Sequence, residues 1–142
     1  MHFGLTEKFE PGRLTLMRRH EKLIDRAIRV AQRSQYRWQH GAVVAKNNKV
    51  IGFAPNRFRN APSIDENNVT VHAEAAVIRE LLKNYPDLKG TTIYIARINK
   101  SGQATISRPC PNCMKTIIEA GIREICYTNE VGGFSVEKLQ IV

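Results

Sequence analysis

Two short motifs hold residue types that can bind a metal ion and move protons. Residues 72–74 read His-Ala-Glu, and residues 109–113 read Pro-Cys-Pro-Asn-Cys. A Cys-x-x-Cys pair at the start of a helix brings two thiolates together, and the helix dipole favours their negative charge. One histidine and two cysteines are three zinc ligands, and a catalytic zinc keeps its fourth position open. The sequence therefore predicts a zinc site formed by His72, Cys110 and Cys113.

Glu74 is the residue beside this predicted site that can transfer a proton. Side chains two positions apart on a regular helix project about 200° from each other, so His72 must lie at the helix entrance. Glu74 can then take a proton from water whose pKa zinc lowers, and return it to a substrate. A structural zinc with Cys126 as fourth ligand is the alternative, but it leaves Glu74 idle. Cys126 itself fits a buried thiol in a strand.

The elements that position these motifs follow from hydrophobic periodicity and from turn residues. The predicted elements are a helix over 14–35, a hairpin of strands over 41–45 and 50–54, a loop over 55–70, a helix over 72–85, a strand over 91–98, a helix that opens at the Cys-x-x-Cys motif and ends at Gly121, and a strand over 124–128. Helices and strands in this order predict a three-layer α/β/α architecture. We expect one domain over 1–142 with an irregular arm over 1–13, and leave the tail after Gly133 unassigned.

Charge is concentrated in the first half of the chain. The whole sequence of 142 residues carries 22 basic and 13 acidic side chains, a net charge of +9. In the first helix an apolar face is predicted from Leu16, Met17, Leu23, Ile24, Ala27 and Ala31. A separate arc holds Arg18, Arg19, Lys22, Arg26, Arg29, Arg33 and Arg37. This arc is either a solvated outer face or a surface that follows the phosphates of a polyanion.

Several classes of protein are disfavoured by composition. No apolar run approaches the roughly 20 residues of a membrane span, and the N-terminus lacks the apolar stretch of a signal peptide. Three cysteines, an odd number, argue against a disulfide framework and for reduced thiols. The sequence therefore favours a soluble cytoplasmic protein.

His-x-Glu followed by Pro-Cys-x-x-Cys resembles the signature of the zinc-dependent nucleoside and nucleobase deaminase superfamily. The resemblance runs from about Gly41 to Thr128, in the element order of that superfamily. Residues 117–127 are most similar to the deoxycytidylate deaminases and to small deaminase-like proteins of phages. In that branch a helix joins the last strands and makes them parallel. The resemblance thus implies the cytidine deaminase-like fold, with a mixed central sheet of about five strands between helices.

The resemblance also implies roles for individual residues. His72, Cys110 and Cys113 would bind one zinc ion per chain, and Glu74 would be the catalytic proton shuttle. The backbone groups of Ala73 and Cys110 would line the pocket for the base. Asn56 would hold the sugar or the base, the alternative being an Asx-turn in its proline-flanked loop.

The favoured substrate is a small cytosine nucleotide, above all deoxycytidylate, which would become the uracil compound with release of ammonia. Arg57 and Arg59 beside Asn56 could receive its phosphate, the alternative being solvated loop charges. A second interpretation is a deaminase of cytosine or adenine within single-stranded DNA or RNA, including tRNA. Tyr36 and Trp38 after the arginine-rich segment could then stack on bases, although Trp38 also fits a partly buried anchor.

Further interpretations remain at this point. The substrate could be another free base or nucleoside, and a zinc-stabilised binding module without catalysis is the third class of function. Resemblance to the superfamily favours a homo-oligomer.

Overall fold

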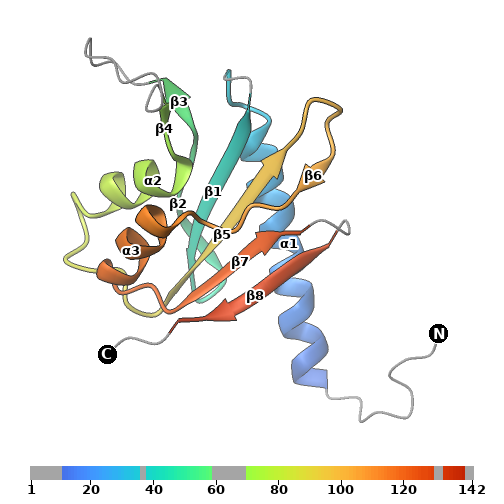
Figure 1. Cartoon of the computed structure of the whole chain (residues 1–142). Helices are drawn as coiled ribbons and strands as arrows, with labels where there is room; N and C mark the ends of the chain where they lie inside the picture. The colour runs from blue at the N-terminus through green and yellow to red at the C-terminus, as the bar shows by residue number, and fades with distance from the viewer. Residues whose placement is uncertain (1–10, 36–37, 59–69, 130–132, 140–142) are drawn as a thin grey trace.

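The computed structural model describes residues 11–35, 38–58, 70–129 and 133–139 (Figure 1). The elements are α1 (Pro11–Ala31), β1 (Gln39–Lys46), β2 (Lys49–Pro55), β3 (Arg57–Phe58), β4 (Thr70–Val71), α2 (Ala73–Leu81), β5 (Thr91–Ile98), β6 (Ala104–Thr105), α3 (Pro111–Glu119), β7 (Glu124–Thr128) and β8 (Phe134–Lys138). Each helix and strand predicted from the sequence is present. The first helix begins earlier than predicted, at Pro11, and residues 1–10 of the predicted arm lie outside the described residues.

Six strands form one mixed sheet. The order is β2-β1-β5-β7-β8, and the short strand β6 pairs with β5. Strands β5 and β7 run parallel, joined through α3, while the other pairs are antiparallel. The parallel pair confirms the expectation of a mixed sheet with a helical crossover. Strands β6 and β8 add to the strands predicted from periodicity, and the order across the sheet holds the five strands that the resemblance implies.

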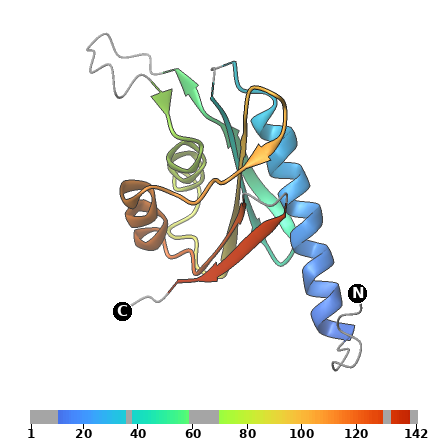
Figure 2. The same cartoon turned by 45° about the vertical axis from the view of Figure 1, so that its right-hand side comes forward.

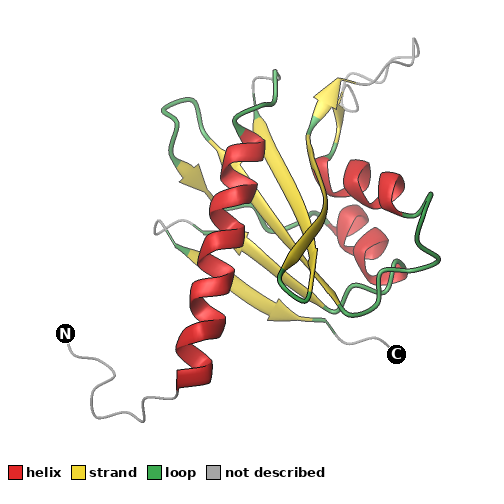
Figure 3. Cartoon of the chain, turned by 180° about the vertical axis from the view of Figure 1, so that it is seen from behind, coloured by secondary structure: helices red, strands yellow, loops and turns green. Residues whose placement is uncertain are grey.

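The sheet separates two layers of helix (Figure 2). Helix α1 covers one face, and α2 and α3 lie together on the other, an arrangement that Figure 3 shows from behind. Side chains of a strand alternate between the two faces. In β1, Ala42 and Val44 accordingly face α2 and α3, whereas Val43 and Ala45 face α1. The predicted three-layer α/β/α fold is confirmed.

Gly41 allows α1 to lie close against the sheet. A Cβ atom at this position would lie 2.5 Å from the carbonyl oxygen of Ala27, and closer still to the backbone nitrogen of Ala31. Both alanines are fully buried in this contact. The end of α1 is thereby held against the start of β1.

The predicted apolar face of the first helix is only partly correct. Leu23, Ile24, Ala27 and Ala31 are buried, but Leu16 is 45% and Met17 47% exposed. The physical reason is visible in Figure 2, where the N-terminal turns of α1 extend past the edge of the sheet. Periodicity shows which residues share a helix face, but not how far the neighbouring layer reaches. Among the described residues, no helix combines the length and apolar character needed to cross a bilayer.

Candidate metal centre

The predicted metal-binding residues lie at the starts of two neighbouring helices. His72 is the N-cap of α2, with extended backbone angles (φ −63°, ψ 144°). Cys110 is the N-cap of α3 (φ −68°, ψ 165°), and Pro111 follows at a position where a helix does not use its N–H. His72 therefore stands at the helix entrance, as the spacing to Glu74 requires. Both helix N-termini present partial positive charge, which favours thiolates.

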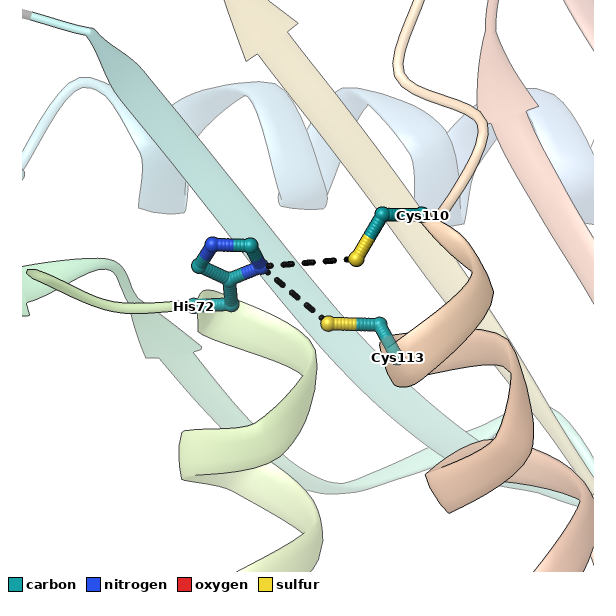
Figure 4. Close-up of side chains that lie close together, drawn as sticks. All are labelled: His72, Cys110 and Cys113. Carbon is teal, nitrogen blue, oxygen red and sulfur yellow. Dashed lines mark hydrogen bonds between the residues drawn. The ribbon is translucent and has the colours of Figure 1, made fainter. Parts of the chain in front are cut away.

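Three donor atoms converge between these helices (Figure 4). Nδ1 of His72 lies 3.2 Å from Sγ of Cys113 and 4.0 Å from Sγ of Cys110. The donor atoms of the three residues all lie within 4.8 Å of one another. Cys113 is buried, whereas His72 and Cys110 are exposed. The cluster is therefore accessible to solvent from one side.

Two titratable groups at this cluster, the Cys113 thiol and the Glu74 carboxyl group, are buried. Burial raises the pKa of the Cys113 thiol, and the neighbouring charges of Glu74 and Cys110 raise it further. Glu74 is only 5% exposed, and burial raises the pKa of its carboxyl group. A backbone hydrogen bond, the His72 charge and a hydrogen bond with Cys113 act in the opposite direction. A divalent cation would stabilise the ionised thiols here, because a metal-bound thiol loses its proton.

The loop that leads into Cys110 is fixed by bonds that sequence reasoning missed. The hydroxyl of Ser107 donates to the carbonyl oxygen of Ile95 over 2.8 Å. Arg108 donates from Nε to one carboxylate oxygen of Glu137 at 2.7 Å and from a terminal nitrogen to the other at 3.1 Å. Glu137 lies on β8, which was not predicted, so no sequence signal pointed to this pair. These bonds set where α3 begins.

The side chain of Asn56 joins the start of β1 to the end of β2. Its side-chain nitrogen donates to the carbonyl oxygen of Trp38 over 2.7 Å, and its side-chain oxygen accepts from the N–H of His40 over 2.9 Å. The side chain is buried. The amide therefore holds the start of β1 against the end of β2, a tie between strands that a local Asx-turn would not provide. Contact of Asn56 with a sugar or base stays a prediction.

Of the other predicted binding residues, Ala73 and Arg57 belong to described elements and Arg59 does not. Ala73 is fully buried at the first position of α2. Arg57 lies in β3, where its Cα is paired with that of Val71, the neighbour of His72. Arg59 falls outside the described residues. The short β3–β4 pair corrects the prediction of a plain loop over 55–70, and it brings the residues after Asn56 back to the start of α2.

The comparison with known families is decisive. The profile described as the cytidine and deoxycytidylate deaminase zinc-binding region matches residues 17–129, far more than half of the chain. The chain belongs to this family.

Individual relatives agree with the family assignment. Human deoxycytidylate deaminase is 33% identical over 102 residues, which are 62% of this chain and 51% of the human protein. The chain thus spans about half the length of this curated relative. Two solved structures share the fold. Deoxycytidylate deaminase of cyanophage S-TIM5 has a TM-score of 0.61 at 22% identity, over 88% of this chain and 89% of its own. Cytidine deaminase of Burkholderia pseudomallei has a TM-score of 0.65 at 20% identity, over 84% and 91%.

The donor set of this deaminase-family chain fits zinc. Ligands of a tetrahedral zinc with nitrogen and sulfur donors stand about 3.5 Å apart, given bond lengths of about 2.1 and 2.3 Å. The separations of 3.2 and 4.0 Å from Nδ1 of His72 lie on either side of this value. Three donors leave one position of a tetrahedral ion for water or substrate. Zinc is therefore the metal of this site.

His40 is a neighbour of the metal centre that sequence reasoning overlooked. Its Cα pairs with that of Arg97 across β1 and β5. Burial lowers the pKa of His40 to about 4, and the charges of Arg97 and His72 lower it as well. His40 is thus neutral at ordinary pH. A single histidine at the start of a strand carries no sequence signal, because only strand pairing brings it here.

Proposed function

We propose that this chain is a zinc-dependent hydrolytic deaminase that converts a cytosine nucleotide to its uracil form, with deoxycytidylate as the first candidate. The observation that carries the proposal is the buried Glu74 beside the converging donor atoms of His72, Cys110 and Cys113. Water supplies the oxygen that replaces the amino group, which leaves as ammonia. Similarity to human deoxycytidylate deaminase supports the choice of substrate.

Each residue has a separate task in this proposal. When bound, zinc lowers the pKa of water and makes hydroxide available near neutral pH. Glu74 would take up the two protons of the attacking water in turn, delivering one to the ring nitrogen and one to the amino group, so that the nitrogen leaves as neutral ammonia. Its raised pKa suits a carboxyl group that must hold a proton for part of the cycle. A binding module without catalysis would have no use for a buried carboxyl group at this position.

The base would lie at the starts of the two helices. The first N–H groups of a helix have no partner within the helix, so the N–H of Ala73 has no acceptor inside α2. The backbone of Cys110 occupies the corresponding position at α3. We assign these two backbone segments to the wall of the base pocket. Asn56 is retained as a sugar-binding candidate through the part of its amide that the backbone does not use.

A substrate panel tests the proposal. Ammonia release would be measured for cytosine, cytidine, deoxycytidine, their mono- and triphosphates, and short single-stranded oligonucleotides. We expect deoxycytidylate to react fastest. If loop cations bind its phosphate, Arg59→Ala should raise the KM for deoxycytidylate, whereas substitution of Arg26 and Arg29 on α1 should leave it unchanged. No ammonia from any compound in the panel would refute the proposed activity.

A groove on the opposite face favours one second candidate, a deaminase that acts within single-stranded nucleic acid. The groove has a volume of about 810 Å³ and lies between α1 and the β1–β2 turn. Its basic lining residues are Arg19, Lys22, Arg26, Arg29 and Lys49. In the turn just after α1, the guanidinium of Arg33 lies 5.6 Å from the ring centre of Phe53. Cations next to an exposed aromatic ring suit a nucleic-acid strand.

The panel separates the two candidates. A strand that contacts several phosphates binds with a steep dependence on salt. Activity confined to oligonucleotides and lost with rising salt would favour the second candidate, and the α1 groove would then be its binding surface.

The setting of the enzyme is also a proposal. We place it in the cytoplasm, because Cys110, Cys113 and Cys126 form no disulfide and reduced cysteines suit that compartment. We further propose a single domain that assembles into a homo-oligomer. Support comes from β2, an outer strand of the sheet on which Phe53 is 49% exposed.

A further inference from the structure

A nucleotide substrate brings a phosphate that the enzyme must bind near the metal centre. This requirement rests on the proposed function. Arg57 and Arg59 were predicted for this task from the sequence, but their side chains lie outside the described part of the structure. The described residues contain another pair of cations at the same end of the sheet, Arg97 and Lys100.

Arg97 lies on the face of the sheet that carries the metal centre. Ile93 and Ile95 of β5 pack into the core beneath α2 and α3. Because side chains alternate along a strand, Arg97 points to this same face, near the end of β5. Its cross-strand partner His40 follows the same rule from Ala42 and Val44. Arg97 and His40 are therefore cross-strand neighbours on the face of the sheet against which α2 and α3 pack.

Trp38 organises the two cations. The guanidinium carbon of Arg97 lies 5.5 Å from the centre of the Trp38 ring, and Nζ of Lys100 lies 5.7 Å from it. Trp38 is 40% exposed, and the side-chain bond from Asn56 to its carbonyl oxygen fixes its backbone. Two like charges beside one ring repel each other unless an anion lies near them, although the ring itself attracts both.

The side chain of Arg97 also has an N–H group without a hydrogen-bond acceptor in the described part of the chain. Within the described residues, its Nε atom is buried and has no hydrogen-bond partner. A buried donor without a partner is unfavourable, and a guanidinium group is well matched to phosphate because it can donate two parallel hydrogen bonds. Lys100, in the exposed turn after β5, contributes a mobile point charge.

We propose that Arg97 and Lys100, held against Trp38, form a subsite for the phosphate of the nucleotide substrate. The subsite lies near the end of β5, on the face of the sheet that also carries the metal centre. It selects a nucleotide over the corresponding nucleoside, because the phosphate pairs with Arg97 and neutralises the repulsion between the two cations.

Tryptophan fluorescence tests binding at this subsite without depending on turnover. Trp38 is the only tryptophan of the chain, so its emission reports on this place alone. Glu74→Gln protein, in which turnover is suppressed, would be titrated with deoxycytidylate, deoxycytidine and inorganic phosphate. We expect saturable changes with deoxycytidylate and, at higher concentration, with phosphate. Deoxycytidine should produce its change only at a concentration at least ~10-fold above that of deoxycytidylate. Equal responses to nucleotide and nucleoside would overturn the proposal.

Substitutions then test selectivity. Arg97→Gln and Lys100→Gln should each lower kcat/KM for deoxycytidylate, with a loss of ~10-fold or more for Arg97→Gln. Activity on deoxycytidine should stay within about 2-fold, since no phosphate contact is lost. Arg97→Lys should restore part of the preference. Arg79→Gln, an exposed arginine in the last turn of α2, is the matched control and should change neither substrate.

The outcomes separate this inference from the proposed function. Equal loss on both substrates would give Arg97 a structural role only and would contradict the phosphate subsite. The phosphate subsite would also be contradicted if Arg97→Gln and Lys100→Gln both kept the wild-type preference for deoxycytidylate over deoxycytidine. If wild-type protein releases no ammonia from any compound, the proposed activity fails, whereas the fluorescence titration still decides whether Trp38, Arg97 and Lys100 bind phosphate. Fluorescence changes with oligonucleotides alone would also reject a mononucleotide subsite.

Discussion

The two faces of the sheet each hold a cluster of histidine, glutamate and cysteine, but only one cluster suits a metal. On the α2 and α3 face, His72 and Cys110 are exposed at helix starts and Cys113 lies behind them. On the α1 face, His20 is 3% exposed and Cys126 is fully buried. Among the described residues, three potential ligand atoms come within 4.8 Å of one another only in the first cluster.

The cluster beneath α1 uses its polar atoms internally. Nδ1 of His20 lies 2.7 Å from the hydroxyl of Tyr94, and the hydroxyl of Thr92 donates to Glu124 over 3.0 Å. Burial raises the pKa of Cys126 to about 12, with a further contribution from Glu124, so this thiol stays protonated. The buried strand thiol expected of Cys126 is thus found. The contrast teaches that convergence at open helix starts makes a metal site, and that the presence of suitable residue types does not.

Removing one buried thiol from each cluster should give the largest contrast. Cys113→Ala deletes a metal ligand, so we expect loss of zinc, loss of activity and a strong decrease in the free energy of unfolding, because metal binding and folding are linked. Cys126→Ala should keep about one zinc per chain and cost about 1 kcal/mol through the small cavity. Elemental analysis and urea unfolding measure both effects. Zinc retained in Cys113→Ala would contradict the ligand assignment.

A glutamate substitution in each cluster sharpens the contrast in chemistry. Glu74→Gln keeps size and polarity but cannot carry a proton, so kcat should fall by at least ~10²-fold while zinc stays bound. Glu124→Gln should leave kcat unchanged, because Glu124 lies on the opposite face, near His20. Steady-state kinetics with metal analysis of each variant measures this. Near-wild-type turnover by Glu74→Gln would show that another group moves the proton.

The smallest expected effect concerns pH and the cluster beneath α1. Burial lowers the pKa of His20 below its usual 6.5, and the nearby Glu124 charge opposes this only in part. The unfolded chain therefore binds a proton at this residue more readily than the folded chain. As pH falls below about 6.5, the free energy of unfolding should decrease.

The comparison that isolates His20 uses His20→Gln. Urea unfolding of both proteins between pH 8 and 5 should show a shallower loss of stability in the variant. Tyr94 stays neutral over this range, because burial raises its pKa, and Glu124 is present in both proteins. Parallel curves for the two proteins would mean that His20 does not contribute to the pH dependence.

Local features of the sequence were sufficient to predict which residues are candidate ligands. The 72–74 and 109–113 motifs each act through a helix start, and a helix start depends on a few consecutive residues such as Pro111. The strand over 91–98 was equally clear, because its β-branched and aromatic residues favour extended backbone. These interactions lie within a few positions of one another, so the sequence by itself determined them.

Tertiary structure decided the rest, because the deciding contacts join distant parts of the chain. Only the packing of α2 beside α3 brings His72 next to Cys110, and only the register of β1 against β5 pairs His40 with Arg97. Strand β8 gave little signal, since its side chains are only partly buried, and its pairing with β7 defines it. Residue types determined which chemistry was available. Strand register and helix packing decided which residues meet. Both depend on contacts between residues far apart in the sequence, so no short segment determines them.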